Sequence, residues 1–357
     1  MADLTLGWRR TQAVRRREHE ETPPVAASIR DVAEQAGVSA STVSRAFSRP
    51  EKVDAVTLRR VLALAEQIGY QPSGAARSLK TGRTGALGIM VPDLSNPFFP
   101  DIVQGAQHRA RAHGYAVLLV DSGEDPALEL SLVRSLARNV DALVLCSPRM
   151  TDAELDEAAL LRPLVLVNRD ATGAAAATAP VTIDNAGGVR QAVRHLHALG
   201  HTRIGYVSGT TASRSYQERL AAFVAETSAA GIRGALIGDY PPTVDGGAAA
   251  ADDALLADVT AVLVYNDIMA AGLIGRLSRL GVELPARLSI VGFDGISLSA
   301  LVTPALTTVR IPLALAGTVA VDRLHAHLVG APTDDRPPAP LPTSLIVRAS
   351  TAALARG

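Results

Sequence analysis

The chain has 357 residues and a formal net charge of zero, with 35 lysines and arginines against 35 aspartates and glutamates. This length suffices for two or three domains, and 48% hydrophobic residues with only 3% aromatics predict cores of alanine, valine and leucine. A single cysteine, Cys146, excludes an intrachain disulfide framework and a cysteine-rich metal site, and no apolar run reaches the ~18 residues of a membrane-spanning helix.

The first 27 residues are rich in arginine, and we expect a disordered tail or a start codon placed too early. No apolar segment follows these arginines, so an export signal is rejected. Charge is unevenly distributed, because residues 1–84 carry 14 basic against nine acidic residues and the remainder carries 21 against 26. A basic amino-terminal end indicates a polyanionic partner there.

Residues 28–69 have a purely helical pattern. Ser28 is placed to cap a first helix, Gly37 can take the left-handed conformation of a tight turn, and Ser39 is placed to cap a second helix. We expect the core of this domain to comprise Val32, Ala33, Ala36, Val43 and Phe47, together with Leu58, Val61, Leu62, Ala65 and Ile68 of a third helix at Val56–Ile68.

The second helix of this segment is expected to enter a DNA major groove, the alternative being a generic helical hairpin. A recognition helix needs short residues for close approach and one long donor for a base edge. Ala40 and Ser41 are short, and Arg45 is the donor. The hydroxyls of Ser39 and Thr42 suit phosphate oxygens.

Residues 70–84 are predicted to be a linker, and from residue 85 short apolar strands alternate with amphipathic helices. This alternation predicts βαβ units in parallel sheets covered by helices, and about 270 residues predict two such subdomains with a break near Val181–Gly187. The predicted strands are Ala86–Val91, Ala116–Asp121, Ala142–Cys146, Leu164–Asn168, Ile204–Ser208, Ala261–Val264, Leu288–Gly292 and Ser344–Val347, and the predicted helices are Pro100–His113, Leu128–Asn139, Ala186–Gly200, Arg214–Gly231 and Asp267–Gly281.

Polar and aromatic residues recur where these strands end. Ligands of open parallel sheets bind beyond the carboxyl ends of the strands, so a cleft between the two sheets is the expected site. Phe98 and Phe99 can stack on a sugar or a base, and arginine, asparagine and aspartate offer planar partners to a polyol. Core packing of the phenylalanines and ordinary loop hydrogen bonds are the alternatives.

A series of motifs runs through the chain in a fixed order, and together they resemble the LacI/GalR (lac repressor/galactose repressor) family over residues 28–350. The motifs are Asp31-Val32-Ala33, Gly37-Val38-Ser39, Thr42-Val43-Ser44-Arg45, Gly69-Tyr70-Gln71-Pro72, Ala76-Arg77-Ser78-Leu79, Gly88-Ile89-Met90-Val91-Pro92, Asn96-Pro97-Phe98-Phe99, Asn266-Asp267, Gly292-Phe293-Asp294 and Thr303-Pro304.

The resemblance implies an all-α helix-turn-helix domain followed by an α/β periplasmic-binding-protein-like core of two parallel-sheet subdomains. The first subdomain would span about 85–183 and 311–333, and the second about 184–310 and 334–350. It also implies Leu79 as a wedge that kinks the duplex. The implied DNA contacts are Ser39, Ala40, Ser41, Thr42, Arg45, Lys52, Ala76 and Leu79, and the implied ligand contacts are Phe98, Phe99, Asn168, Arg169, Arg214, Tyr240, Asn266 and Asp294.

The implied function is that of a cytoplasmic repressor without a cofactor, a homodimer on a near-palindromic double-stranded operator, controlled by a sugar-like effector. Ile311 stands where the family often has glutamine, so a nucleoside, a purine or another non-sugar effector stays open. An enzyme is the first rival, but no nucleophile elbow, Walker loop or dinucleotide fingerprint is present. A transporter's solute-binding protein is the second, and it would not carry residues 28–84.

Overall fold

The computed structural model describes residues 27–70, 82–209, 211, 213–331 and 338–354. Contacts divide the chain into two units, residues 1–80 and 81–357, each described by itself below. The predicted tail at 1–26 and the predicted linker contacts Ala76 and Leu79 lie outside the described residues. Among the helices that are described, none is long and apolar enough to cross a membrane.

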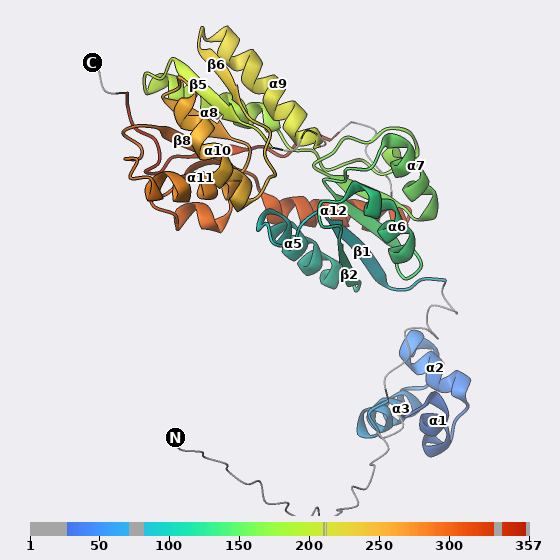
Figure 1. Ribbon diagram of the computed structural model, residues 1–357. Coiled ribbons are helices and arrows are strands. Elements are labelled where there is room, and N and C mark those ends of the chain that lie inside the picture. The colour runs from blue at the N-terminus through green and yellow to red at the C-terminus, as the bar shows by residue number, and fades with distance from the viewer. Residues whose placement is uncertain (1–26, 71–81, 210, 212, 332–337, 355–357) are drawn as a thin grey trace, which may run out of the picture. The chain divides into compact units, whose positions relative to one another are not determined.

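The amino-terminal unit folds as the predicted helix-turn-helix with a third helix (Figure 1). Its elements are α1 (Ile29–Ala36), α2 (Ala40–Ser48), the 3₁₀ turn η1 (Pro50–Lys52) and α3 (Ala55–Gln67). Ser28 and Asp31 cap α1 reciprocally, since each side chain accepts the backbone N–H of the other. Gly37 ends α1 at φ 61°, which a residue with a Cβ rarely adopts.

The core of this unit differs from expectation at one position. Val32, Val43 and Val61 are fully buried, as predicted. Leu62, however, is 40% exposed, and Leu64 packs against the core instead. Both leucines lie beside the apolar stripe of α3, so the sequence pattern did not separate them.

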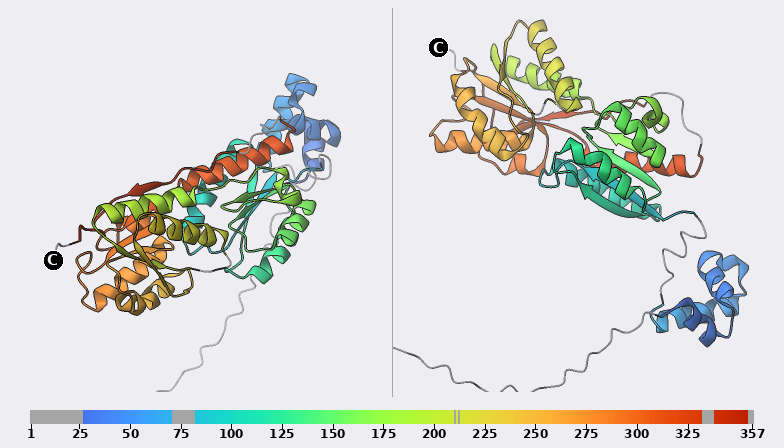
Figure 2. Two further views of the ribbon diagram at one scale, coloured as in Figure 1. Left: turned by 90° about the horizontal axis from the view of Figure 1, so that it is seen from above. Right: turned by 45° about the vertical axis from the view of Figure 1, so that its right-hand side comes forward.

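The second unit contains two sheets, one parallel and one parallel except at its edge strand β10, with helices packed on them (Figures 1 and 2). The first sheet has the order β2-β1-β3-β4, and the second has the order β10-β9-β8-β7-β5-β6. The strands are β1 (Ala86–Val91), β2 (Ala116–Asp121), β3 (Ala142–Cys146), β4 (Leu164–Val167), β5 (Arg203–Val207), β6 (Arg233–Ile237), β7 (Ala261–Val264), β8 (Ser289–Asp294), β9 (Thr307–Arg310) and β10 (Ser344–Ile346). The helices are α5 (Phe98–Ala112), α6 (Pro126–Leu136), α7 (Asp152–Leu161), α8 (Asn185–Ala198), α9 (Arg214–Ala229), α10 (Val244–Leu256), α11 (Asp267–Arg279) and α12 (Leu313–Leu328), with 3₁₀ turns η2 (Gly173–Ala177) and η3 (Ser297–Ala300).

Strands β1, β2, β3 and β7 have the predicted bounds, and the other predicted strands and helices are present with shifted ends. Elements β6, β9, α7, α10 and α12 were not predicted. Strand β6 is a sheet edge with exposed residues, and β9 carries two buried threonines, so neither has the apolar run of an interior strand. The predicted parallel sheets are confirmed for the other strand pairs, and β10 alone among the described strands pairs antiparallel, with β9.

The chain returns to the first sheet through α12, the red helix beside α5 in Figures 1 and 2. Two glycines let these helices approach closely. A Cβ on Gly105 would lie 2.0 Å from the carbonyl oxygen of Ala314, and a Cβ on Gly317 would lie 2.0 Å from that of Ile102. The backbone of α12 therefore packs directly against the backbone of α5, where α12 joins the first subdomain.

Candidate functional site

The amino-terminal half of α2 presents a polar, exposed surface. The side chains of Ser39, Ala40, Ser41 and Arg45 are exposed. The Ser39 hydroxyl accepts the backbone N–H of Thr42 at 3.2 Å and lies 2.7 Å from the Ser41 hydroxyl. Arg45 donates from Nε to the Ser41 carbonyl oxygen at 3.2 Å and is exposed, as a contact with a base edge requires.

Lys52 ends η1 and is also exposed. It therefore lies on the surface of the same unit, as a phosphate contact requires. The predicted DNA contacts in the described part of this unit are all at least partly accessible.

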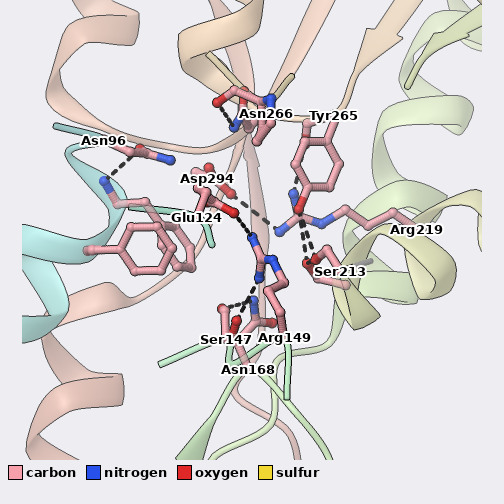
Figure 3. A pocket seen from close by; sticks show the side chains of 14 residues that line it. Asn96, Glu124, Ser147, Arg149, Asn168, Ser213, Arg219, Tyr265, Asn266 and Asp294 are labelled. Carbon is pink, nitrogen blue, oxygen red and sulfur yellow. Dashed lines mark hydrogen bonds and ion pairs between the residues drawn. The ribbon is translucent and has the colours of Figure 1, made fainter. Parts of the chain in front are cut away.

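A pocket lies between the two subdomains of the second unit, beyond the carboxyl ends of both sheets (Figure 3). In each sheet the strand order reverses direction once, between β1 and β3 and between β5 and β7. Such reversal points open a crevice in which ligands bind. The residues lining the pocket are Asn96, Phe98, Phe99, Glu124, Ser147, Arg149, Asn168, Ser213, Ser215, Arg219, Pro242, Tyr265, Asn266 and Asp294.

Backbone strain is concentrated at this pocket. Among the described residues, the non-glycine residues with positive φ are Glu124 at 60°, Ser147 at 45°, Asn168 at 58° and Asp294 at 111°. All four line the pocket. Each such conformation costs about 1–3 kcal/mol, and strain of this kind persists mainly at functional sites.

The wall from the first subdomain is built around a buried arginine. Arg149 donates from Nη2 to Glu124 Oε2 at 2.7 Å and from Nη1 to the Ser147 carbonyl oxygen at 2.6 Å. Asn168 donates from Nδ2 to the Ser147 hydroxyl at 3.0 Å. The wall thus carries one ion pair and two polar side chains at the ends of β3 and β4.

The opposite wall has its own buried ion pair, Arg219 Nη2 with Asp294 Oδ1 at 3.3 Å. Arg219 also donates from Nη1 to the Tyr265 carbonyl oxygen at 2.7 Å, and its guanidinium lies 3.7 Å from the ring centroid of Phe293. Burial raises the pKa of Asp294, and the charge and hydrogen bond of Arg219 oppose that rise by favouring the ionised carboxylate. Because Arg219 is bound on several sides, it holds Asp294 in a set position.

Asp267 supports the turn that carries Asp294. Its carboxylate accepts the backbone N–H groups of Gly295 and Ile296 and the hydroxyls of Ser299 and Thr308. Burial raises the pKa of Asp267 to about 6, against the lowering effect of these four donors. The turn is therefore pinned immediately after the strained residue.

The pocket is narrow in this structure and partly open to solvent. Its cavity volume is about 30 Å³, which has room for a water molecule but not for a sugar. Among the described polar side chains that line or adjoin the pocket, one hydrogen bond joins the two walls. Asn185 donates from Nδ2 to Asn168 Oδ1 at 3.4 Å. A ligand of sugar size therefore needs the walls to part, and few polar contacts resist that opening.

The predicted ligand residues divide into three groups. Phe98, Phe99, Asn168, Asn266 and Asp294 line the pocket.

Arg169 lies instead in an adjoining hollow, bound to the Pro148 carbonyl oxygen and Asp152. Arg214 is exposed at the start of α9, and Tyr240 donates its hydroxyl to Asp253, so neither lines the pocket. The predictions for Arg214 and Tyr240 therefore do not match the geometry, and Arg219 is the arginine of α9 that reaches the pocket.

Several lining residues were not predicted, although the rule that polar groups follow strand ends applies to them. Ser147 comes directly after β3, and Tyr265 comes directly after β7. Glu124 and Arg149 follow within three residues of their strands. The same reasoning, extended by a few positions into each loop, would have found them.

Two family models match the chain. A model for bacterial regulatory proteins of the lacI family matches residues 28–73, and a model for a periplasmic binding protein-like domain matches residues 193–351. They cover the helix-turn-helix unit and most of the second subdomain.

Similar proteins span nearly the whole chain. The HTH-type transcriptional repressor CytR of Escherichia coli (strain K12) is 33% identical over 343 residues, which is 92% of this chain and 97% of that protein. The HTH-type transcriptional regulator GalS of Salmonella typhimurium is 35% identical over 301 residues, covering 83% and 88%.

Solved structures agree with these relatives. A lac repressor dimer bound to operator and the anti-inducer ONPF superimposes with a TM-score of 0.81 at 26% identity, covering 92% of this chain and all of that one. The regulator CelR in complex with cellobiose gives 0.65 at 28% identity, covering 91% and all of that chain. The chain therefore belongs to the lacI family of bacterial regulatory proteins.

Proposed function

We propose that this protein is a sequence-specific DNA-binding transcriptional regulator, most simply a repressor, whose operator affinity is set by a small neutral ligand bound between the two subdomains. The observation that carries this proposal is the convergence of all four described positive-φ, non-glycine residues on one pocket, at the reversal points of both sheets. A fold keeps such strain where binding needs it.

The ligand's chemistry follows from the charges of the walls. Each arginine of the pocket faces a carboxylate on its own wall, Arg149 with Glu124 and Arg219 with Asp294. Their formal charges cancel, so the pocket favours an uncharged ligand that both donates and accepts hydrogen bonds. Phe98, Phe99 and Tyr265 add apolar ring faces. A monosaccharide or related carbohydrate fits this description, and a nucleoside is the second candidate because ring faces also stack on bases.

Regulation follows by linkage between the two sites. A ligand that bridges the walls selects one closure angle of the subdomains, and it shifts DNA affinity by the difference in its affinity for the open and closed states. An inducer lowers operator affinity and a corepressor raises it. We assign no catalytic role to the pocket, and a regulator that binds DNA acts in the cytoplasm.

We further propose that the protein works as a homodimer on a near-palindromic operator. Strand β2 is an edge strand of the first sheet, and its Leu118 and Leu119 are 40% and 38% exposed. An exposed apolar edge is a ready surface for a second copy. Two recognition helices related by a two-fold axis then read two half-sites.

The ligand half of the proposal is tested by a thermal-shift screen of the full chain against monosaccharides and nucleosides. A ligand that binds only the folded state raises the unfolding temperature. Each hit is then added to the protein bound to an operator fragment selected from random DNA. A hit that changes operator affinity supports the proposal, whereas ligands that stabilise the protein without any effect on DNA binding contradict the linkage.

The DNA half is tested by Arg45→Ala. Loss of one bidentate base contact costs about 1–3 kcal/mol, so we expect operator binding to be about five- to 150-fold weaker in an electrophoretic mobility assay. Arg138→Ala, which removes an exposed arginine from the second unit, is the control and should bind as wild type. Wild-type affinity in Arg45→Ala would show that another element reads the bases.

A further inference from the structure

The loop after β3 brings Arg149 into the pocket at a cost to the fold. The arginine side chain is only 5% exposed. The backbone N–H groups of Arg149 and Met150 donate to Glu129 Oε2 at 2.7 and 2.9 Å. Glu129 is completely buried, and its other carboxylate oxygen, Oε1, finds no hydrogen-bond partner among the described residues.

This arrangement of the loop lowers the stability of the fold. Burial raises the pKa of Glu129, and an unpartnered buried polar atom costs about 1–3 kcal/mol. Ser147 and Glu124, which bind the arginine, both hold strained backbone conformations. Three unfavourable features thus surround one side chain.

Arg149 does not hold the subdomains together. The side-chain partners of Arg149 among the described residues, Glu124 and Ser147, belong to its own wall. These bonds use two of the five N–H groups of the guanidinium, and the described residues accept none from the other three. Arg149 nevertheless lies toward the middle of the pocket, where Figure 3 shows it between Glu124 and Ser147. Its remaining donors are available to whatever lies between the walls.

Resting on the function proposed above, we propose that Arg149 and Glu124 together are the specificity-determining pair of the first wall, binding adjacent hydroxyl groups of a neutral ligand and discriminating against its phosphorylated form. The guanidinium donates to hydroxyl oxygens, and the carboxylate accepts from hydroxyl hydrogens. Glu124 neutralises the charge of Arg149, so a phosphate group finds no unpaired cation to bind. The carboxylate of Glu124 also repels the phosphate.

Glu124→Gln tests this pair because it keeps the side-chain shape and removes the charge. Arg149 then becomes an unpaired buried cation, which is a strained state that an anion relieves. We expect the variant to bind neutral ligands about tenfold more weakly and to gain affinity for anions. The measurement is a thermal-shift titration of the full chain with ribose and ribose 5-phosphate, galactose and galactose 1-phosphate, and inorganic phosphate.

The matched control is Glu157→Gln. Glu157 pairs with Arg134 on the surface of the same subdomain, with both side chains about half exposed, so its loss leaves no buried charge. Arg149→Lys is the second variant. It keeps the charge but loses the planar set of donors, and it should weaken neutral ligands without creating a phosphate preference.

The outcomes separate this inference from the function on which it rests. A phosphate-dependent rise in unfolding temperature in Glu124→Gln, absent from wild type and Glu157→Gln, supports the assignment of Arg149 and Glu124. This conclusion holds even if no neutral ligand binds. In that case the proposed ligand class fails and the assignment stands. If phosphate and the phosphorylated sugars stabilise Glu124→Gln no more than they stabilise wild type, the assignment of Arg149 and Glu124 is overturned.

Discussion

At the scale of single residues, this pocket is defined by groups that are costly to bury or to bend. Asn168 and Asp294 hold left-handed backbone conformations, which asparagine and aspartate tolerate better than most residues. Asp294 also places its carboxylate against Arg219 out of water. These costs concentrate on the residues that would face a ligand, which explains why the site is polar although it lies within a largely aliphatic unit.

Asp294→Asn should abolish the ligand response while the recognition helix keeps its DNA affinity. The amide cannot accept as a carboxylate does, and Arg219 is left without its counter-ion, so we expect ligand affinity to fall at least tenfold. Thermal shift with a hit from the screen measures the loss, and operator binding without ligand is the control. An unchanged ligand-induced shift would remove Asp294 from the site.

The sequence located part of this site but not its polar centre. Phe98, Asn168 and Asn266 were predicted because they lie in or beside the loops that follow strands and because the family resemblance implies them. The resemblance implied Arg214 as the arginine of α9 that binds ligand, whereas Arg219 lines the pocket. Arg219 lies further along the same helix, and only the packing of α9 shows which arginine turns inward.

At the scale of elements, the close crossing of α5 and α12 depends on two glycines, which have no side chain to separate the helices. Gly105 and Gly317 permit backbone contact that any Cβ would obstruct. The sequence pattern shows neither glycine as special, because α12 was not recognised as a helix. The buried residues of α12 do recur at helical spacing, but apolar residues also occupy exposed positions such as Leu315, which is 47% exposed, so the buried stripe does not stand out from the sequence.

Gly105→Ala should destabilise the second unit by about 1–3 kcal/mol, the usual cost of overpacking a close contact. Gly275→Ala in α11 is the matched control, since nothing lies within 4 Å of a Cβ there, and it should be neutral or stabilising by up to about 1 kcal/mol. Urea unfolding followed by circular dichroism measures both. Equal stabilities for the two variants would contradict the close crossing.

At the scale of the whole molecule, the proposed homodimer places the edge of the first sheet at its interface. Replacing Leu118 and Leu119 with lysine introduces two charges on that edge, so we expect dissociation in sedimentation velocity and weaker operator binding. Leu160→Lys, at a leucine 81% exposed on α7, controls for the loss of an exposed leucine. A double variant that sediments as wild type would exclude β2 from the interface.

The sequence by itself determined the helix-turn-helix and the succession of βαβ units. Helix caps, the turn at Gly37 and apolar periodicity depend on residues close together in the chain, so they can be recognised from the sequence alone. The antiparallel β10 and the edge strand β6 were not legible in this way, because strand direction and edge position depend on pairing with distant segments.

Only the tertiary structure decided which side chains form the pocket. Arg219 and Asp294 are 75 positions apart in the chain, and Arg149 and Glu124 are 25 apart. The order of strands in each sheet brings their loops to the same edge, and the burial that results raises the pKa of Asp294. Neither the strand order nor the burial of these side chains is a local property of the sequence. Together they bring the loops of the two walls into a single site.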